Sequence, residues 1–178
     1  MQIRSWLAGV VVPFALLSCR STGADRPLAW ALAIHGGAGT LARSTPPEKQ
    51  KEYEAALTAA LAYGRDRLAR GDNAIDVCEA VVRILEDDPH FNAGKGAVYN
   101  ERGEHELDAS IMDGSTLRCG AVAGVRTVKN PVSLARLVME KTRHILLMGD
   151  GAEKFADAQG VERVPNTWFD TEHRRKAL

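Results

Sequence analysis

The chain has 178 residues, of which 45% are apolar and 26% are charged, a composition typical of ordinary globular proteins. This length is enough for one hydrophobic core and does not require two. The formal net charge is zero, so there is neither the basic excess of a nucleic-acid-binding protein nor the acidic run of a solvated tail. The composition therefore predicts one folded domain and no nucleic-acid partner.

Residues 1–19 are typical of an export signal. Arg4 supplies a positive charge, and the apolar run that follows is too short to span a bilayer as a permanent helix. The run ends at Leu16-Leu17-Ser18-Cys19, which resembles the lipobox of bacterial lipoproteins, and the alternative is an ordinary signal peptide in which Cys19 is incidental. We therefore expect an exported protein, either periplasmic or anchored by a lipid at Cys19, with residues 20–29 as a polar tether.

The next part of the chain is predicted to contain a strand, a glycine loop and two helices. The strand covers 28–34 and runs into His35-Gly36-Gly37-Ala38-Gly39. Apolar residues at steps of three and four predict a helix from Pro47 to the glycine at 71. Asp72 or Asn73 caps the second helix, which Pro89 ends. Its predicted buried side consists of Ile75, Cys78, Val81, Val82 and Leu85.

A block of strands follows a second glycine loop, Phe91-Asn92-Ala93-Gly94-Lys95-Gly96. Apolar and alternating patterns predict the later elements in this order: strands over 97–99, 106–112 and 117–128, a helix from Pro131 to Glu140, a strand over 144–148 and a helix over 151–159. From residue 166 onward the sequence shows no clear helix or strand pattern, and its last residues are rich in charge. Helices first and strands afterwards favour a mixed α/β arrangement over a regular βαβ series.

Titratable side chains alone do not identify a site. The five histidines form no metal motif. Glu106 and Asp108 would share one face of a strand, but we favour structural hydrogen bonding for them and for Asp113 over paired acid–base catalysis. Cys78 and Cys119 are expected to be small buried residues, with a disulfide between them as the minor alternative.

The two glycine loops are better signals, because glycine lets backbone N–H groups approach a ligand without a Cβ clash. The first loop lacks the glycine spacing of a dinucleotide site and does not open a helix. It is similar to the oxyanion loop of some esterases, but the chain has no Gly-x-Ser-x-Gly motif for the nucleophile of such an enzyme. Taken singly, each loop is more often a tight structural turn than a binding site.

Taken together, the motifs resemble the plant-type asparaginase and isoaspartyl-peptidase family. The resemblance covers about residues 30–165, and it rests on five blocks in this order: Ala33–Gly39, Phe91–Val98, His105–Gly114, Gly120–Val125 and Asn130–Glu140. It implies an α+β fold, the αββα sandwich of N-terminal-nucleophile hydrolases, of which the chain would hold only the N-terminal α-subunit portion over 30–165. Residues 166–178 would begin the linker between the subunits.

The resemblance implies an amidohydrolase that acts on asparagine, on β-aspartyl dipeptides, or on both. In this family a precursor cleaves itself, and the threonine freed at the new N-terminus is the nucleophile, with its own α-amine as the base. The sequence holds no Gly-Thr-Val-Gly motif, so the nucleophile is expected beyond Leu178 and no catalytic residue within the chain. The expected partners are the β-subunit part of the same precursor and a second αβ unit in a homodimer.

Little of the family's site transfers to this chain. Gly36 and Gly37 match a loop beside the cleavage point, and Asn92 matches an asparagine that orients the nucleophile. The resemblance also implies a structural sodium ion and no organic cofactor. Hard cations bind oxygen ligands. The expected ligands of the sodium ion are the main-chain carbonyls of Leu85, Glu86, Asp88, Phe91, Ala93 and Lys95.

Two functions remain open from the sequence. The first is the N-terminal part of an asparaginase or isoaspartyl peptidase that is inactive until its other part completes it. The second is an exported binding or scaffold lipoprotein that retains the half-fold without the chemistry.

Overall fold

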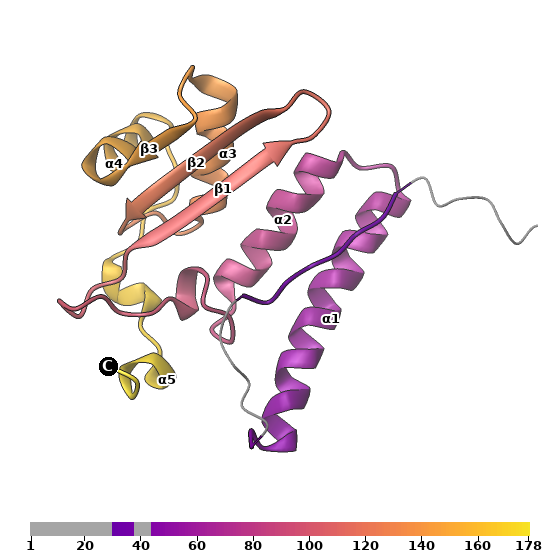
Figure 1. Cartoon of the computed structure of the whole chain (residues 1–178), viewed down its shortest axis with the longest axis vertical. Coiled ribbons are helices and arrows are strands. Elements are labelled where there is room, and N and C mark those ends of the chain that lie inside the picture. Colours follow the sequence, from indigo (N-terminus) through magenta and orange to yellow (C-terminus); the bar gives the residue numbers. More distant parts are fainter. Residues whose placement is uncertain (1–29, 38–43) are drawn as a thin grey trace, which may run out of the picture. The chain divides into compact units, whose positions relative to one another are not determined.

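The computed structural model describes residues 30–37 and 44–178 (Figure 1). The chain divides into two units, Met1–Ala31 and Leu32–Leu178, and every helix and strand named below lies in the second. Within the described ranges no helix is both long and apolar enough to cross a membrane. Three predictions lie outside the described residues: the export signal over 1–19, lipidation of Cys19 and the tether over 20–29.

The first two helices pack side by side (Figure 1). Helix α1 (Pro47–Ala69) begins with proline, whose missing N–H has no partner to lose at a helix start. Helix α2 (Ala74–Asp87) begins after Asn73, whose Oδ1 accepts a hydrogen bond from the Ile75 N–H at 2.9 Å. Both helices and this cap confirm the sequence prediction. A buried cluster joins the helices to the second glycine loop: Ala60, Val77, Val81, Leu85 and Phe91.

The predicted buried side of α2 is wrong at Cys78, which is exposed. Cys78 shares a stripe of α2 with Ile75 and Val82, but it lines an open surface hollow between α2 and the end of the first strand. Val77 packs toward α1, whereas Ile75 and Val82 pack against the core of the sheet. Cys119 is half-buried, and both thiols are free, so the disulfide alternative is also wrong.

The sheet has three strands in the order β1–β2–β3. Strand β1 (Leu107–Asp113) runs antiparallel to β2 (Arg118–Val125), and β2 runs parallel to β3 (Leu146–Met148). Helix α3 (Pro131–Lys141) provides the crossover that parallel neighbours need. These elements confirm the predicted strands and helix to within a few residues at each end.

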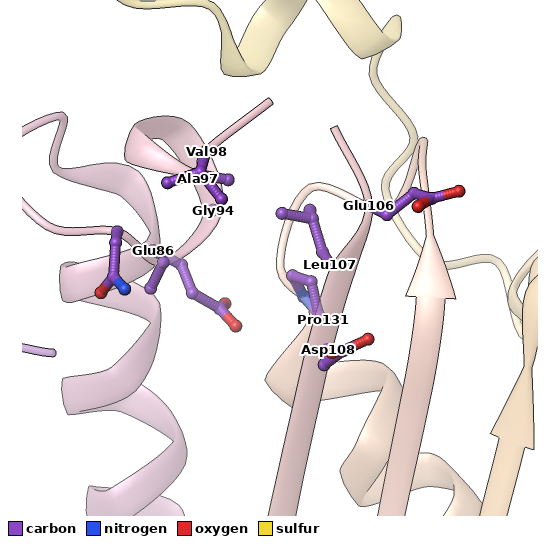
Figure 2. Close-up of a pocket in the computed structure, with 10 residues that line it drawn as sticks. Glu86, Gly94, Ala97, Val98, Glu106, Leu107, Asp108 and Pro131 are labelled. Carbon is purple, nitrogen blue, oxygen red and sulfur yellow. The ribbon is translucent and has the colours of Figure 1, made fainter. Parts of the chain in front are cut away.

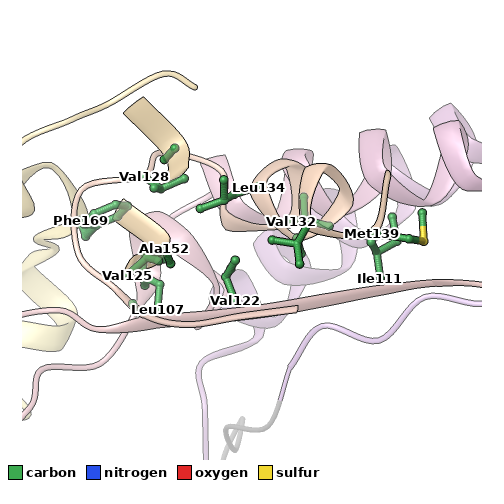
Figure 3. Close-up of a cluster of buried hydrophobic side chains, with 14 residues drawn as sticks. Leu107, Ile111, Val122, Val125, Val128, Val132, Leu134, Met139, Ala152 and Phe169 are labelled. Atoms are coloured by element: carbon green, nitrogen blue, oxygen red, sulfur yellow. The ribbon is translucent and has the colours of Figure 1, made fainter. Parts of the chain in front are cut away.

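The core of the sheet lies between its inner face and α3. Ile111 and Val122 point from the strands toward Val132 and Met139 on the helix (Figure 3). The backbone of α3 packs directly on the sheet at Gly120, where a Cβ would overlap the carbonyl oxygen of Ala135. This close contact of one helical layer and one strand layer confirms the predicted α+β class.

The C-terminal residues extend this core. Helix α4 (Gly149–Ala158) follows β3, and the 3-10 helix η2 (Asn166–Phe169) precedes the short helix α5 (Glu172–Arg175). Phe169 is completely buried within the core of the sheet. The start of the predicted linker therefore contributes to the folded unit.

The outer face of the sheet is open in the part of the chain that the structure describes. Because side chains alternate along a strand, Ser110 and Met112 of β1 share this face with their neighbours on β2 and β3. On β3, Leu146 and Met148 are 50% and 67% exposed. The described residues therefore leave apolar side chains of this sheet face uncovered.

Two predicted strands do not form. Residues 30–34 and 97–99 are irregular, because a strand needs a hydrogen-bonded neighbour and the described residues provide none beside them. Ile34 packs instead against the cluster between α1 and α2. One side of this segment is therefore partly buried although it forms no strand.

Candidate functional site

The structure brings the two glycine loops together. A Cβ at Gly36 would lie 3.2 Å from the Phe91 ring and 3.3 Å from Leu57. At Gly37, where φ is +94°, a Cβ would overlap Asn92 Oδ1. Only glycine fits such a position without strain and collision. The three residues expected to support the active site therefore lie in contact, although Asn92 is far from the other two in sequence.

The second glycine loop is held by its own backbone. Phe91 is buried, and its N–H donates to the Asp88 carbonyl at 3.3 Å. The N–H of Gly96 donates to the Ala93 carbonyl at 3.2 Å within the 3-10 helix η1 (Gly94–Gly96). The Asn92 side chain is therefore presented from a tightly turned segment.

Two of the six carbonyls expected to bind sodium, those of Leu85 and Glu86, lack helical hydrogen-bond partners at the end of α2. The carbonyl of Leu85 lies four residues before Pro89, and proline has no backbone N–H that could donate a helical hydrogen bond to this carbonyl. The carbonyl of Glu86 lies four residues before His90, whose N–H donates to the Asp88 carboxylate at 2.9 Å. Carbonyls without helical partners suit a hard cation. Among the described residues, no group of three or more acidic, histidine or cysteine side chains could hold a metal ion.

The side chain of Glu86 is a feature that the sequence prediction missed. It is 3% exposed, and Oε1 accepts a hydrogen bond from the Val132 N–H at 2.9 Å, at the start of α3. Oε2 has no hydrogen-bond partner among the described residues. Burial raises the pKa of this carboxyl to about 7, against the opposing effects of the Val132 N–H and the Asn130 side chain. The signal in the sequence was its position four residues after Val82, on the apolar stripe of α2.

Glu86 borders a cavity of about 210 Å³ between α2, the second glycine loop and β1, which we call the Glu86 cavity (Figure 2). Its lining includes Asn92, so it lies beside the contact of the two loops. Apolar parts of the lining come from Ala97, Leu107 and Pro131. None of the described residues that line it is Lys, Arg or His.

The strand carboxylates have structural partners, as the sequence predicted. Asp108 Oδ1 accepts a hydrogen bond from the Gly124 N–H at 2.8 Å. Glu106 pairs with Arg102 at 3.1 Å on the surface. Hydrogen bonds from the residues that follow Asp113 lower the pKa of its carboxyl. Acid–base catalysis by these groups therefore has no geometric support.

Thr171, the last threonine of the chain, has a structural role. The Thr171 hydroxyl accepts the Arg174 N–H at 3.3 Å and caps α5. Buried His105 lies nearby, but its Nε2 is 3.1 Å from Asp170 Oδ1. This contact holds the C-terminal segment against the rest of the folded unit. Thr171 and His105 thus have structural contacts in the described part of the chain.

Comparisons with known proteins agree with this partial site. A family model described as asparaginase matches residues 28–178. The chain is 52% identical over 143 residues to a probable isoaspartyl peptidase/L-asparaginase 2 of Arabidopsis thaliana, covering 80% of this chain and 44% of the relative. It is 51% identical over 148 residues to an isoaspartyl peptidase of Salmonella typhimurium, covering 83% and 47%. The chain therefore spans about half the length of the curated relatives it matches.

Proposed function

Because the chain belongs to the asparaginase family, we propose that it is the N-terminal part of an amidohydrolase that cleaves asparagine, β-aspartyl dipeptides, or both. The names of its relatives, isoaspartyl peptidase and L-asparaginase, describe these two activities. The contact of Gly37 with the Asn92 side chain carries the proposal, because it assembles two separate family motifs into one site. The comparisons give no support to the alternative of a non-catalytic scaffold lipoprotein.

In this proposal the chain positions groups and the C-terminal part supplies the reaction. A threonine hydroxyl of that part attacks the side-chain amide of the substrate, and its own α-amine accepts the proton. An oxyanion hole stabilises the tetrahedral intermediate. The contribution of this chain is the Asn92 side chain, which the Gly37 backbone packs against and which orients the threonine.

The open sheet face supports a C-terminal part as the partner. A second sheet packed on the exposed side chains of Met112, Leu146 and Met148 would complete an αββα sandwich. The same burial would remove the apolar surface that the described residues leave uncovered. A homodimer of the completed units is a further expectation from the family resemblance.

A fusion protein tests this function directly. Residues 20–178 are joined to the C-terminal half of the Salmonella isoaspartyl peptidase, and release of amino acids from β-aspartyl-leucine and of ammonia from asparagine is measured. We expect turnover by the fusion and none by this chain alone. The control is the fusion whose nucleophilic threonine is replaced by alanine. Turnover by the chain alone, or a folded fusion without turnover, contradicts the proposal.

We also propose a structural sodium ion at the end of α2, held by the main-chain carbonyls named from the sequence. Leu85 and Glu86 contribute the carbonyls without helical partners. The ion would brace the loop that presents Asn92. The melting temperature of the chain should be higher in sodium chloride than in choline chloride at equal ionic strength. Equal melting temperatures contradict this proposal.

Export with lipidation at Cys19 is a separate proposal that rests on the lipobox resemblance. Cells that express the full chain should incorporate labelled palmitate into it. Cys19→Ala should abolish the label, whereas the control Cys78→Ala should retain it because Cys78 lies on α2 of the folded unit. Labelling that survives Cys19→Ala contradicts lipidation at this position.

A further inference from the structure

The C-terminal segment over residues 166–175 folds against the second glycine loop, and we call it the C-terminal clamp. Its 3-10 helix η2 packs against η1, the 3-10 helix of the loop. The Nζ of Lys95 lies 4.6 Å from the centre of the Trp168 ring, within the range of a cation–π interaction. A segment expected to begin a linker is therefore in contact with the loop that presents Asn92.

The position of the clamp is fixed by the two ends of the sheet. The Asn166 side chain accepts a hydrogen bond from the His105 N–H at 3.0 Å, just before β1, and donates to the His105 carbonyl at 2.9 Å. It also donates to the Arg126 carbonyl at 2.8 Å, just after β2. Further along the clamp, Asp170 Oδ1 lies 3.1 Å from Nε2 of the buried His105. These contacts hold the clamp without using the glycine loop.

Arg174 is the clamp residue that reaches the backbone of the glycine loop. Its Nε donates to the Gly96 carbonyl at 2.7 Å. This carbonyl ends η1, where carbonyls have no partner within the helix. A hydrogen bond from an ionised donor is stronger than one between neutral groups. The backbone N–H of Arg174 donates to the Thr171 hydroxyl at 3.3 Å, which holds Arg174 in α5.

An ion pair does not account for the Arg174 side chain. Its neighbours Arg175 and Lys176 pair with the carboxylates of Asp170 and Glu172, at 2.8 Å and 2.6 Å. In the part of the chain that the structure describes, no carboxylate lies within ion-pair distance of the Arg174 guanidinium. The contact with the loop carbonyl is therefore the interaction to explain.

The contact at Gly96 extends to Asn92 through the backbone of the loop. A Cβ at Gly96 would overlap the carbonyl oxygen of Phe91, the residue before Asn92. The Gly96 N–H also donates to the Ala93 carbonyl, the residue after Asn92. These two contacts close residues 91–96 into one turn. A displacement of Gly96 therefore displaces the segment that presents Asn92.

We propose that Arg174 is a positioning residue for Asn92, because it holds the Gly96 carbonyl and thereby keeps the glycine loop where the Gly37 backbone meets the Asn92 side chain. Its effect on catalysis rests on the proposed function, in which Asn92 orients the nucleophilic threonine. Misplacing an orienting group slows the reaction without weakening substrate binding. The placement of Asn92 itself depends on no activity.

NMR spectra of the full chain test this placement. Arg174→Met removes the donor and retains an unbranched stem, and it should shift the Asn92 side-chain amide signal. The matched control Lys176→Met also removes a cation from α5, but it breaks only an exposed pair with Glu172, so the Asn92 signal should stay unchanged. An unshifted Asn92 signal in Arg174→Met, or equal shifts in both variants, overturns the proposal.

Loss of folding in Arg174→Met also overturns the proposal. The completely buried Phe169 anchors the clamp in the core of the sheet, whereas Arg174 is half-buried. A side chain that only positions the loop should therefore leave the folded unit intact. A general structural role would lower the melting temperature of the chain without moving the Asn92 signal.

The catalytic consequence is measured in the fusion protein with β-aspartyl-leucine. Arg174→Met should lower kcat at least about tenfold and change KM by less than about twofold. Lys176→Met should leave both values unchanged. An unchanged kcat, or a change in KM alone, overturns the positioning role in catalysis. If the unaltered fusion cleaves nothing, the proposed function fails, and the Asn92 signal still decides whether Arg174 positions this side chain.

Discussion

Replacing Glu86 by Gln removes a buried carboxyl whose ionisation opposes folding. Burial raises its pKa from the ordinary 4.5 to about 7, although the Val132 N–H favours the ionised form. The side chain is 3% exposed, so screening by solvent does not reduce the free-energy cost of ionising the carboxyl. The difference between the two pKa values corresponds to about 3 kcal/mol in the free energy of unfolding.

The direction of the pH dependence follows from proton binding in the folded and unfolded chain. Below pH 4.5 the carboxyl is protonated in both states, so burial carries no ionic penalty. Between pH 4.5 and about 7 the unfolded chain has released this proton and the folded chain has kept it, so stability falls as the pH rises. Above about pH 7 the carboxyl is ionised in both states, and the full free-energy cost of burying its charge lowers the stability of the folded chain.

Urea denaturation of the full chain and of Glu86→Gln from pH 4.5 to pH 8 measures this effect. The difference in unfolding free energy should change by about 3 kcal/mol in favour of the variant across this range. The pKa of His173 is lowered by burial and by Lys49, which has the opposite effect on stability, but it is common to both proteins and cancels. The exposed Glu162→Gln control should follow the wild type. A difference that does not vary with pH refutes the reasoning.

Two further predictions concern the glycine contact and the C-terminal segment. Gly37→Ala should destabilise the chain by about 1–3 kcal/mol and shift the Asn92 side-chain amide signal in NMR spectra. The control Gly71→Ala also has a positive φ, but a Cβ there meets nothing within 4 Å, so its Asn92 signal should stay unchanged. Phe169→Ala should lower the free energy of unfolding by about 3–5 kcal/mol, measured by urea denaturation, because the Phe169 ring is completely buried. Leu178→Ala, at a 72% exposed position, should change stability by less than about 0.5 kcal/mol.

The candidate site was predictable only in part. The motif resemblance named Gly36, Gly37 and Asn92, and folding places them in contact. Their roles in catalysis remain predictions. The unpaired carboxylate of Glu86 was not foreseen, because burial on the second face of α2 depends on which element packs there. No local pattern shows whether a carboxylate oxygen will find a partner.

The sequence by itself determined the elements whose signals are local. Asn73 and Pro131 mark helix starts through hydrogen bonds and backbone angles within a few residues. Only the tertiary structure decided that residues 30–34 form no strand, that Cys78 is exposed and that Phe169 lies in the core. Strand pairing and burial are set by residues distant in the chain. Local periodicity shows which side chains avoid water, and packing decides which of them find a neighbour.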